Sequence, residues 1–300
     1  GEKYAIICDA STAKLFGKPL LGKMKKAGLL AELFSFPAGE QSKSAKVLIE
    51  LQNKMLAKGF GRSSAIIALG GGVTGDLAGF VAATYMRGIS YVQVPTTLLA
   101  MVDSSIGGKV AIDLPYGKNS CGAFHQPKAV FIDLNCLKTL PLAQLSNGLA
   151  EIVKHAMIAD AGLFSLLEKN VKAIMKKDLT LLGKVIKRNC EIKAKIIEKD
   201  EFEKNLRKTL NYGHTVGHAL EILGKYKRFS HGRAISIGMV VEAEISHLLG
   251  FLSVEEVERQ NLLLESFGLP VLLPNFSPSK IVSLMRHDKK AEKGRAMFVL

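Results

Sequence analysis

The second half of the chain contains residue types that bind transition metals. His214 and His218 stand four positions apart, on one face of the segment if it is helical. His231 follows them, and Glu151 stands earlier in the chain. Histidines with one carboxylate and an open coordination position are typical of catalytic zinc sites. The spacing alone favours His214 and His218 as a ligand pair. Histidines at this spacing are more often packing or hydrogen-bonding residues, so both interpretations stay open.

A glycine-rich segment in the first half could bind phosphate. It reads Ala68-Leu-Gly-Gly-Gly-Val-Thr-Gly-Asp76, between an expected strand and an expected helix. Glycines let the backbone approach a ligand closely, and N–H groups at a helix N-terminus attract phosphate. The segment lacks the G-x-G-x-x-G fingerprint, so reasoning from the ordinary dinucleotide fold applies only in part. A tight turn is the alternative. Because a turn needs fewer than three glycines, we favour phosphate contact.

Two short clusters of glycine and lysine indicate another place for anionic groups. Gly107-Gly108-Lys109 ends a segment in which Thr96 and Thr97 could donate hydroxyl groups to a nucleotide. Gly117-Lys118-Asn119 follows shortly after it. Each cluster alone is weak evidence, but together they favour a binding site for anions.

The elements that must position these residues differ between the two halves. Strands are expected at 4–8, 64–69, 90–94 and 129–133, with helices at 45–58 and 74–86 between them. This alternation predicts an α/β domain over residues 1–141.

Residues 142–300 show helical periodicity almost throughout, and they predict an all-α domain. Ser253 and Glu256 form a capping box that begins one helix, and Ser277-Pro278 is a second helix start. Residues 234–249 are apolar enough for a core helix.

The net charge of +14, from 41 Lys and Arg against 27 Asp and Glu, fits a polyanionic partner. Nucleic acid, an anionic membrane and a small anionic substrate all meet that description. Much of the excess lies in residues 169–208 at helical spacing, where a solvated helix face is the simpler interpretation. Because aromatic content is 7% with no Trp, base stacking gains little support, and we expect no nucleic-acid partner.

No apolar stretch reaches the ~18 residues needed to span a bilayer. No cationic and apolar leader opens the chain, so we expect a cytoplasmic protein that does not bind membranes. The four cysteines include no C-x-x-C pair and are expected to be reduced packing residues. Because the chain starts close to a strand and ends in an apolar run, we also expect that it is trimmed.

Several of these segments, taken in order, resemble the 3-dehydroquinate synthase family. The resemblance rests on residues 70–80, 85–88, 93–109, 150–154, 211–219 and 288–290. It implies a Rossmann-like NAD-binding α/β domain followed by an all-α domain that binds metal and substrate. It also implies one NAD and one zinc ion, with Co²⁺ as a possible substitute. Family members are typically longer at both ends.

The resemblance implies three groups of site residues. Zinc would be bound by Glu151, His214 and His231, which replaces the pair favoured by spacing and places His218 beside the substrate. NAD would be bound by Asp9, Glu40, Lys43, Gly71, Gly72, Val73, Asp76, Thr96, Thr97, Leu99, Lys118 and Thr139. The substrate would be surrounded by Asp103, Lys109, Asn119, Lys154, Lys193, Arg207, Asn211, His218, Lys289 and Lys290.

The resemblance further implies a homodimer, because the family's arginine at the position of Arg87 reaches the phosphate site of the neighbouring subunit. The chain departs from the family at Gln144, where an acidic residue is common, and this puts NAD affinity in doubt but not the reaction.

The implied reaction is a lyase step of the shikimate pathway, which leads to chorismate and the aromatic amino acids. The substrate, 3-deoxy-D-arabino-heptulosonate 7-phosphate, would be oxidised transiently by NAD, lose phosphate, be reduced again and close by an intramolecular aldol step to 3-dehydroquinate. Net redox change is zero. Since cofactor and substrate residues come from both halves, we expect the halves to close around the substrate.

Two related activities are the nearest alternatives. Sister sugar-phosphate cyclases, such as inosose or aminodehydroquinate synthases, share the fold, NAD and zinc. Lys193, Arg207 and His218 favour a substrate that carries a carboxylate over the substrates of these sister enzymes. A metal-dependent polyol dehydrogenase would lack the phosphate-binding lysines and would produce NADH.

Overall fold

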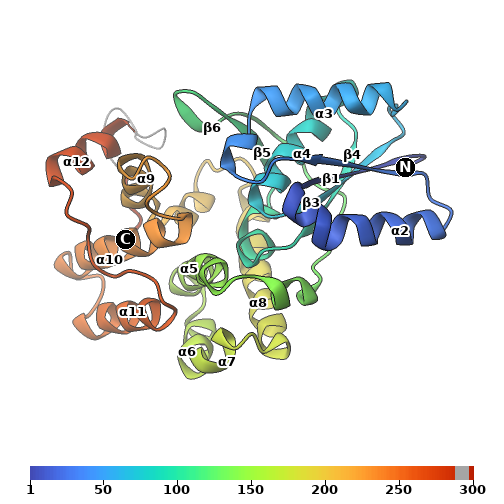
Figure 1. Ribbon diagram of the computed structural model, residues 1–300. Helices are drawn as coiled ribbons and strands as arrows, with labels where there is room; N and C mark the ends of the chain where they lie inside the picture. Colours follow the sequence, from blue (N-terminus) through green and yellow to red (C-terminus); the bar gives the residue numbers. More distant parts are fainter. Residues whose placement is uncertain (288–296) are drawn as a thin grey trace. The chain divides into compact units, whose positions relative to one another are not determined.

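A computed structural model describes residues 1–287 and 297–300 of the chain. They form two compact units, Gly1–Thr139 and Leu140–Leu300. All strands among the described residues belong to the first unit, and the second is helical (Figure 1). The predicted combination of an α/β and an all-α region is confirmed.

The first unit is built on a four-stranded parallel sheet. Its strands lie in the order β2-β1-β3-β4, with β1 at Tyr4–Asp9, β2 at Ala31–Phe36, β3 at Ala65–Gly70 and β4 at Ser90–Pro95. The strands are apolar runs because helices cover both faces of such a sheet. The edge strand β2 was not predicted, because Glu32 and Ser35 interrupt its apolar pattern.

Alternate side chains of β1 point to opposite faces of the sheet, as the strand geometry requires. Ala5 and Ile7 pack with helices α3 (Ala45–Ala57) and α4 (Gly72–Thr84). Ile6 and Cys8 pack on the other face, with helix α2 (Lys18–Lys26). Figure 1 shows α2 and α3 on opposite sides of β1.

Short helical segments connect these elements. They are α1 (Ala10–Thr12) and the single turns at Ala13–Gly17, Glu40–Ser42, Tyr85–Arg87, Ala100–Ser104 and Leu134–Thr139.

An antiparallel hairpin packs against α4. It consists of β5 (Lys109–Leu114) and β6 (Gly117–Phe124). The approach to α4 is close, since a Cβ on Gly79 would lie 2.4 Å from Val110 Cγ1. Of the two clusters of glycine and lysine, Gly107-Gly108-Lys109 leads into β5 at Lys109, and Gly117-Lys118-Asn119 begins β6.

The prediction of a strand at 129–133 is wrong. Only an isolated bridge joins Val130 to Gln93 of β4, with the N–H of Gln93 bonded to Ala129 O and that of Phe131 to Gln93 O. Phe131 is 60% exposed, so this apolar run is not buried as a sheet strand would be.

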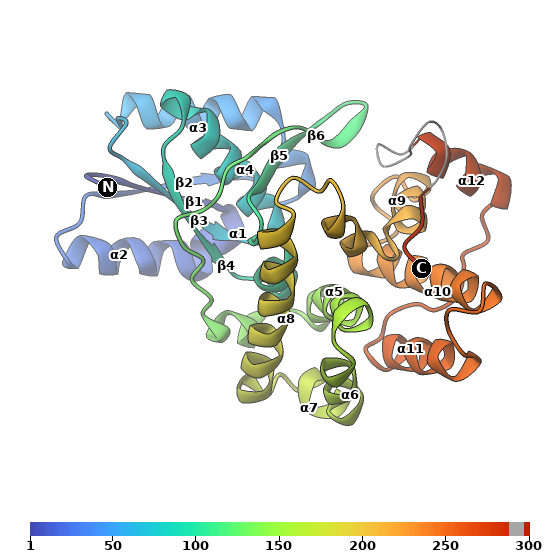
Figure 2. The same ribbon diagram turned by 180° about the vertical axis from the view of Figure 1, so that it is seen from behind.

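The second unit consists of helices. They are α5 (Leu142–Ala159), α6 (Ala161–Lys169), α7 (Val171–Met175), α8 (Leu179–Lys199), α9 (His214–Leu223), α10 (His231–Leu248), α11 (Val254–Ser266) and α12 (Pro278–His287), with a turn at Leu206–Asn211. Helix α5 is central and contacts α6, α8 and α10 (Figure 2). The capping box predicted at Ser253 and Glu256 is present at the start of α11.

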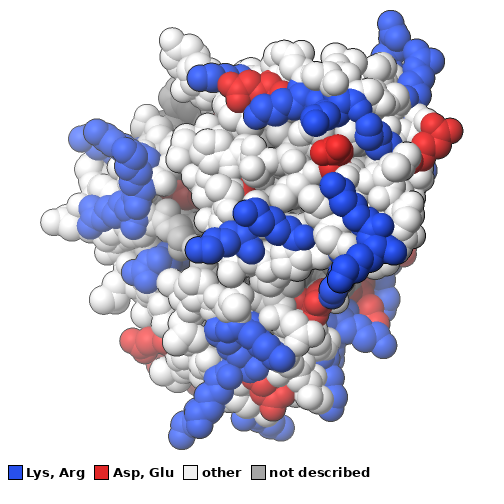
Figure 3. All heavy atoms as spheres, turned by 45° about the vertical axis from the view of Figure 1, so that its right-hand side comes forward, with Lys and Arg blue, Asp and Glu red and all other residues white. Residues whose placement is uncertain are grey.

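The charge of residues 169–208 follows the helical pattern. On α8, Lys184, Lys187, Lys195 and Lys199 are exposed, whereas Lys193 is buried. On the face drawn in Figure 3, Lys and Arg side chains form several separate groups with Asp and Glu between some of them. Among the described residues, no helix combines the length and apolar character needed to cross a membrane.

Candidate active site and metal centre

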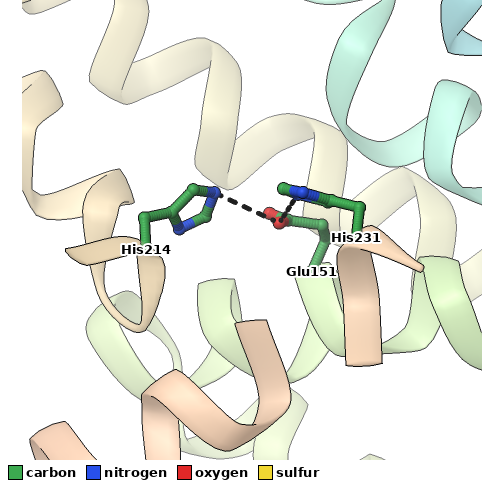
Figure 4. A group of neighbouring side chains, drawn as sticks. All are labelled: Glu151, His214 and His231. Carbon is green, nitrogen blue, oxygen red and sulfur yellow. Dashed lines mark hydrogen bonds and ion pairs between the residues drawn. The ribbon is translucent and has the colours of Figure 1, made fainter. Parts of the chain in front are cut away.

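Three helices of the second unit bring Glu151, His214 and His231 together (Figure 4). One donor atom from each lies within 4.8 Å of the other two. Glu151 Oε1 is 3.1 Å from His231 Nε2 and 3.6 Å from His214 Nε2. Two imidazole nitrogens and a carboxylate oxygen are the ligand set of catalytic zinc sites with an open position.

The position of each side chain follows from its place in a helix. Glu151 lies in the middle of α5 and has no exposed surface. His214 and His231 are the first residues of α9 and α10. Gly213, which precedes His214, has a φ of 77°, a conformation that strongly favours glycine.

The second nitrogen of each histidine faces an oxygen. His214 Nδ1 donates to Tyr212 O at 3.1 Å, and Glu221 Oε1 lies 3.7 Å from His231 Nδ1. Partners of this kind fix the ring and leave Nε2 for a metal ion.

The charges around Glu151 are balanced. Burial alone would raise the pKa of Glu151, but the Lys154 ammonium at 2.5 Å and the two histidines hold it well below its usual range. Burial would lower the pKa of His231, yet its contacts with Glu151 and Glu221 raise it to about 10. A buried carboxylate beside two imidazoles, which can release a proton and bind through nitrogen, suits a divalent cation, so these three residues fit a metal ion by donor type and spacing.

His218 lies beside this group and is not part of it. Its ring centroid is 5.4 Å from that of His214, edge to face. The structure thus groups His214 with Glu151 and His231 rather than with the histidine four positions on.

Other candidate residues of the second unit are buried cations and an amide. Lys154, Lys193 and Arg207 are 1%, 6% and 3% exposed, and Arg207 donates to Glu201 O. Asn211 Nδ2 donates to Glu203 Oε1 at 2.9 Å. Lys289 and Lys290 lie outside the described residues.

In the first unit, candidate NAD residues follow the carboxyl ends of three adjacent strands. Asp9 ends β1, Gly71 follows β3, and Thr96 follows β4. Ligands of open α/β sheets bind at this edge. Asp9 caps α1 by accepting N–H bonds from Ser11 and Thr12 at 2.8 and 3.0 Å.

The start of α4 offers backbone N–H groups in a narrow space. Gly71 and Gly72 are only partly buried. A Cβ on Gly71 would lie 3.2 Å from Thr97 Cγ2, and one on Gly72 would lie 3.2 Å from Ser104 Oγ. Larger residues would fill the space in front of these N–H groups, which supports the predicted phosphate contact.

A polar cluster lies next to α4. Lys43 donates to Asp76 Oδ2 at 2.5 Å and to Asn119 Oδ1, and Lys118 lies 3.1 Å from Glu40. Burial would lower the pKa of Lys43, but Asp76 outweighs it and raises the value. The structure therefore joins Lys43, Asp76 and Asn119 by hydrogen bonds, and the charge of Glu40, which pairs with Lys118, acts on Lys43.

The remaining candidates of this unit are more dispersed. Asp103 lies in the turn Ala100–Ser104, Lys109 is exposed at the start of β5, and Arg87 has a φ of 69° after α4. Val73 and Leu99 are partly buried, and the Thr139 hydroxyl donates to Cys136 O at 3.3 Å.

Most of the chain matches one family. Residues 33–147 match the family described as 3-dehydroquinate synthase N-terminal, and residues 148–291 match 3-dehydroquinate synthase C-terminal. The chain belongs to the 3-dehydroquinate synthase family. It is 47% identical over 300 residues to the 3-dehydroquinate synthase of Thermodesulfovibrio yellowstonii, covering 100% of this chain and 84% of that protein. The enzyme of Desulforamulus reducens is 46% identical, with coverage of 100% and 84%.

Solved structures place this family member among sugar-phosphate cyclases. The 2-epi-5-epi-valiolone synthase of Streptomyces hygroscopicus, with NAD⁺ and Zn²⁺ bound, matches with a TM-score of 0.90 at 29% identity over 99% of this chain and 86% of that one. A 2-deoxy-scyllo-inosose synthase with carbaglucose-6-phosphate, NAD⁺ and Co²⁺ matches with a TM-score of 0.88 at 30% identity, over 96% and 80%. A Schizosaccharomyces pombe glycerol dehydrogenase, at 16% identity and a TM-score of 0.72, shares the fold.

Three acidic residues near the site of this family member were not predicted from the sequence. Glu221 stands two turns after His214 on α9, and this spacing is a signal that could have found it. Asp200 accepts the N–H groups of Asn205 and Arg207, and Glu203 accepts from Asn211. Both lie in turns, where periodicity gives no signal.

Proposed function

We propose that the chain is a 3-dehydroquinate synthase, a lyase that converts 3-deoxy-D-arabino-heptulosonate 7-phosphate to 3-dehydroquinate and phosphate. One observation carries the proposal: a Glu151–His214–His231 metal group in a chain 47% identical over its whole length to a relative of that name. The pathway follows from the name, since 3-dehydroquinate is an intermediate of the shikimate pathway.

The cofactors of the proposed reaction are NAD and zinc. Glu151, His214 and His231 would hold the metal ion, and similar structures carry Zn²⁺ or Co²⁺ with NAD⁺. The pyrophosphate of NAD would lie at the start of α4, with the polar cluster of Lys43, Asp76 and Glu40 beside the nucleotide.

When bound, the metal supplies a Lewis acid for the substrate hydroxyls, and NAD supplies a transient hydride acceptor. The chain's own residues do the rest. Lys154, Lys193 and Arg207 are buried cations suited to a phosphate and a carboxylate, with Arg207 able to bind the planar carboxylate through two N–H groups. They would hold one flexible substrate in place, so that oxidation, elimination, reduction and ring closure occur within a single bound molecule.

Asn211 and His218 would orient the substrate hydroxyls close to the metal group. His218 is in ring contact with His214, and Asn211 ends the turn that contains Arg207. Asp103, Lys109 and Asn119 of the first unit, with Lys289 and Lys290, complete the proposed substrate set.

A second candidate is a sister cyclase, because the two structural matches above are a valiolone synthase and an inosose synthase. Their names do not indicate a carboxylate on the substrate, whereas the three buried cations of this chain provide for one in addition to phosphate.

A substrate panel separates the two. Purified enzyme with NAD and zinc is offered 3-deoxy-arabino-heptulosonate 7-phosphate, a heptulose 7-phosphate without the carboxylate, and glucose 6-phosphate, and the carbocyclic product is identified by mass spectrometry and NMR. We expect 3-dehydroquinate from the first and no turnover of the others. Preferential turnover of either sugar phosphate that lacks a carboxylate would assign the chain to the sister activity.

The proposed assembly is a homodimer in the cytoplasm. Arg87 would reach the phosphate site of the neighbouring subunit, and its exposure and position on a turn at the end of α4 are compatible with such a contact.

A further inference from the structure

Helix α10 contributes to the proposed metal centre in two ways. It begins with His231, and further along it supports the turn that holds His214. A Cβ on Gly238 would lie 1.8 Å from Gly213 O, and a Cβ on Gly213 would lie 2.8 Å from Ile235 O. The backbone before His214 therefore rests directly on the backbone of α10, and only glycines allow this contact.

A buried carboxylate fixes this contact. Glu242, one turn after Gly238 and without exposed surface, accepts the N–H of Gly213 at 2.8 Å. The residue before Gly213 is also held by a hydrogen bond, because the Tyr212 hydroxyl donates to the buried Gln260 at 2.6 Å. Since Tyr212 O accepts from His214 Nδ1, both contacts fix the peptide that orients the His214 ring.

A second anchor joins α10 to α5. Asn147, one turn before Glu151, accepts the N–H of Gly232 through Oδ1 at 2.6 Å. A Cβ on Gly232 would lie 2.3 Å from Asn147 O, so the two helices also touch here backbone to backbone. Gly232 follows His231, and the anchor thus fixes the spacing between His231 and Glu151.

Neither side chain belongs to the group of donors that faces the metal. Asn147 lies one helical turn before Glu151, and both side chains accept a hydrogen bond from the backbone of a glycine next to a histidine ligand.

We propose that Glu242 and Asn147 are positioning residues that hold His214 and Glu151 at fixed distances from His231, so that the three donors are in place before the metal arrives. The inference rests on the proposed metal site. Residues behind the ligands of metal sites change metal affinity by roughly 10–100-fold when they are replaced.

The test compares variants that remove or keep the anchor. Glu242→Leu and Asn147→Leu remove the acceptor, whereas Glu242→Gln keeps an acceptor oxygen of the same reach. Ser236→Ala is the matched control, because it removes a buried hydrogen bond of α10, to Pro270 O at 2.8 Å, outside the metal group. Three quantities are measured on purified protein: Zn²⁺ affinity by chelator competition, the visible spectrum of the Co²⁺ form, and the melting temperature of the apoprotein.

We expect the two leucine variants to lose roughly tenfold or more in Zn²⁺ affinity and to show an altered Co²⁺ spectrum. Glu242→Gln should recover most of the affinity, and Ser236→Ala should lower the melting temperature while binding metal as the wild type does. If the leucine variants only melt earlier, with unchanged affinity and spectrum, the positioning role is wrong.

Two further outcomes are distinguishable. If Glu242→Leu does not fold, Asn147→Leu and Tyr212→Phe decide by the same readouts, with the same expected losses. If the wild type itself binds neither Zn²⁺ nor Co²⁺, the metal site of the proposed function fails and this inference is overturned with it.

Discussion

Glu151 is a fully buried carboxylate whose charge is balanced by one lysine and two histidines. Such a group is stable only with positive partners, and a divalent ion held by His214 and His231 would be a stronger one than a protonated imidazole. The chemistry of the proposed site therefore depends on two histidines near each other in space, only one of which belongs to the pair visible in the sequence.

The two histidines of that pair should differ in effect. We expect His214→Ala to lower bound zinc to well below one ion per chain, because it removes one of three donors. His218→Ala should retain zinc and lose turnover of substrate. Metal content by atomic emission, measured on protein dialysed against trace zinc, checks both, and loss of zinc in both variants would restore the pair favoured by spacing.

At the residue scale, the sequence pattern identified candidate metal ligands but not which of them lie together in space. The donors Glu151 and His231 are separated by 80 positions, and periodicity relates only residues within a few turns. Their grouping was implied by the family resemblance alone. Asn147 and Glu242 gave no signal, because a polar residue in a helix is ordinary until its burial is known.

Individual helices are held by side chains at their ends. Asp160 caps α6 by accepting the N–H of Leu163 at 3.0 Å, and it forms two hydrogen bonds with Arg188 of α8. Although burial would raise the pKa of Asp160, the bonds from Arg188 and the Leu163 N–H lower it below the usual value of 3.8.

This lowered pKa gives a pH-dependent contribution to stability. A carboxyl group with a lower pKa in the folded than in the unfolded state stabilises the fold above its unfolded pKa, and the effect is lost as pH falls through the folded pKa. Asp160→Asn should therefore lower the melting temperature at neutral pH, with a difference from the wild type that shrinks as pH falls below the usual pKa of 3.8. Thermal unfolding between pH 3 and 8 measures this, and a difference independent of pH would contradict it.

The N-cap hydrogen bond of Asp160 can be tested separately from the charge of its carboxylate. Asparagine is a good N-cap, so Asp160→Ala should cost about 1 kcal/mol more than Asp160→Asn at every pH. Equal losses in the two variants would show that the Leu163 hydrogen bond contributes nothing.

At the element scale, buried parallel strands and capped helices were predicted, and the hairpin was not. Strands β1, β3 and β4 are continuous apolar runs, whereas β6 contains Gly117-Lys118-Asn119-Ser120 and alternates between exposed and partly buried residues. Its pairing comes from β5 and its packing from α4, and neither is visible in its own composition. The run at 129–133 shows the converse: it is apolar, yet in the described part of the chain it forms one isolated bridge with Gln93 and leaves Phe131 exposed.

The whole molecule comprises two units, and the residues proposed for NAD and for the metal belong to different units. The nucleotide set belongs to Gly1–Thr139, and the metal group belongs to Leu140–Leu300. The chain covers 81–84% of the length of its similar relatives. The division between a sheet and a helical region was readable from the change in period near residue 141, whereas no sequence pattern reports an assembly of subunits.

The proposed homodimer is testable with mixed subunits. Arg87→Ala and His231→Ala should each be inactive, but a heterodimer of the two, purified through different affinity tags, should recover about half of the wild-type activity. In that heterodimer one site combines an intact metal group with the arginine of the other subunit. Full activity of Arg87→Ala alone, or an inactive heterodimer, would contradict the shared site.

The central claim is tested most directly by phosphate release from 3-deoxy-arabino-heptulosonate 7-phosphate. The full-length enzyme is assayed with catalytic NAD, after chelation and again after Zn²⁺ is returned, while absorbance at the NADH band is followed. We predict that release requires both NAD and the metal and that no NADH accumulates, since the hydride returns to the substrate. No release from a folded, zinc-loaded enzyme, or NADH formed in step with turnover, would contradict the account.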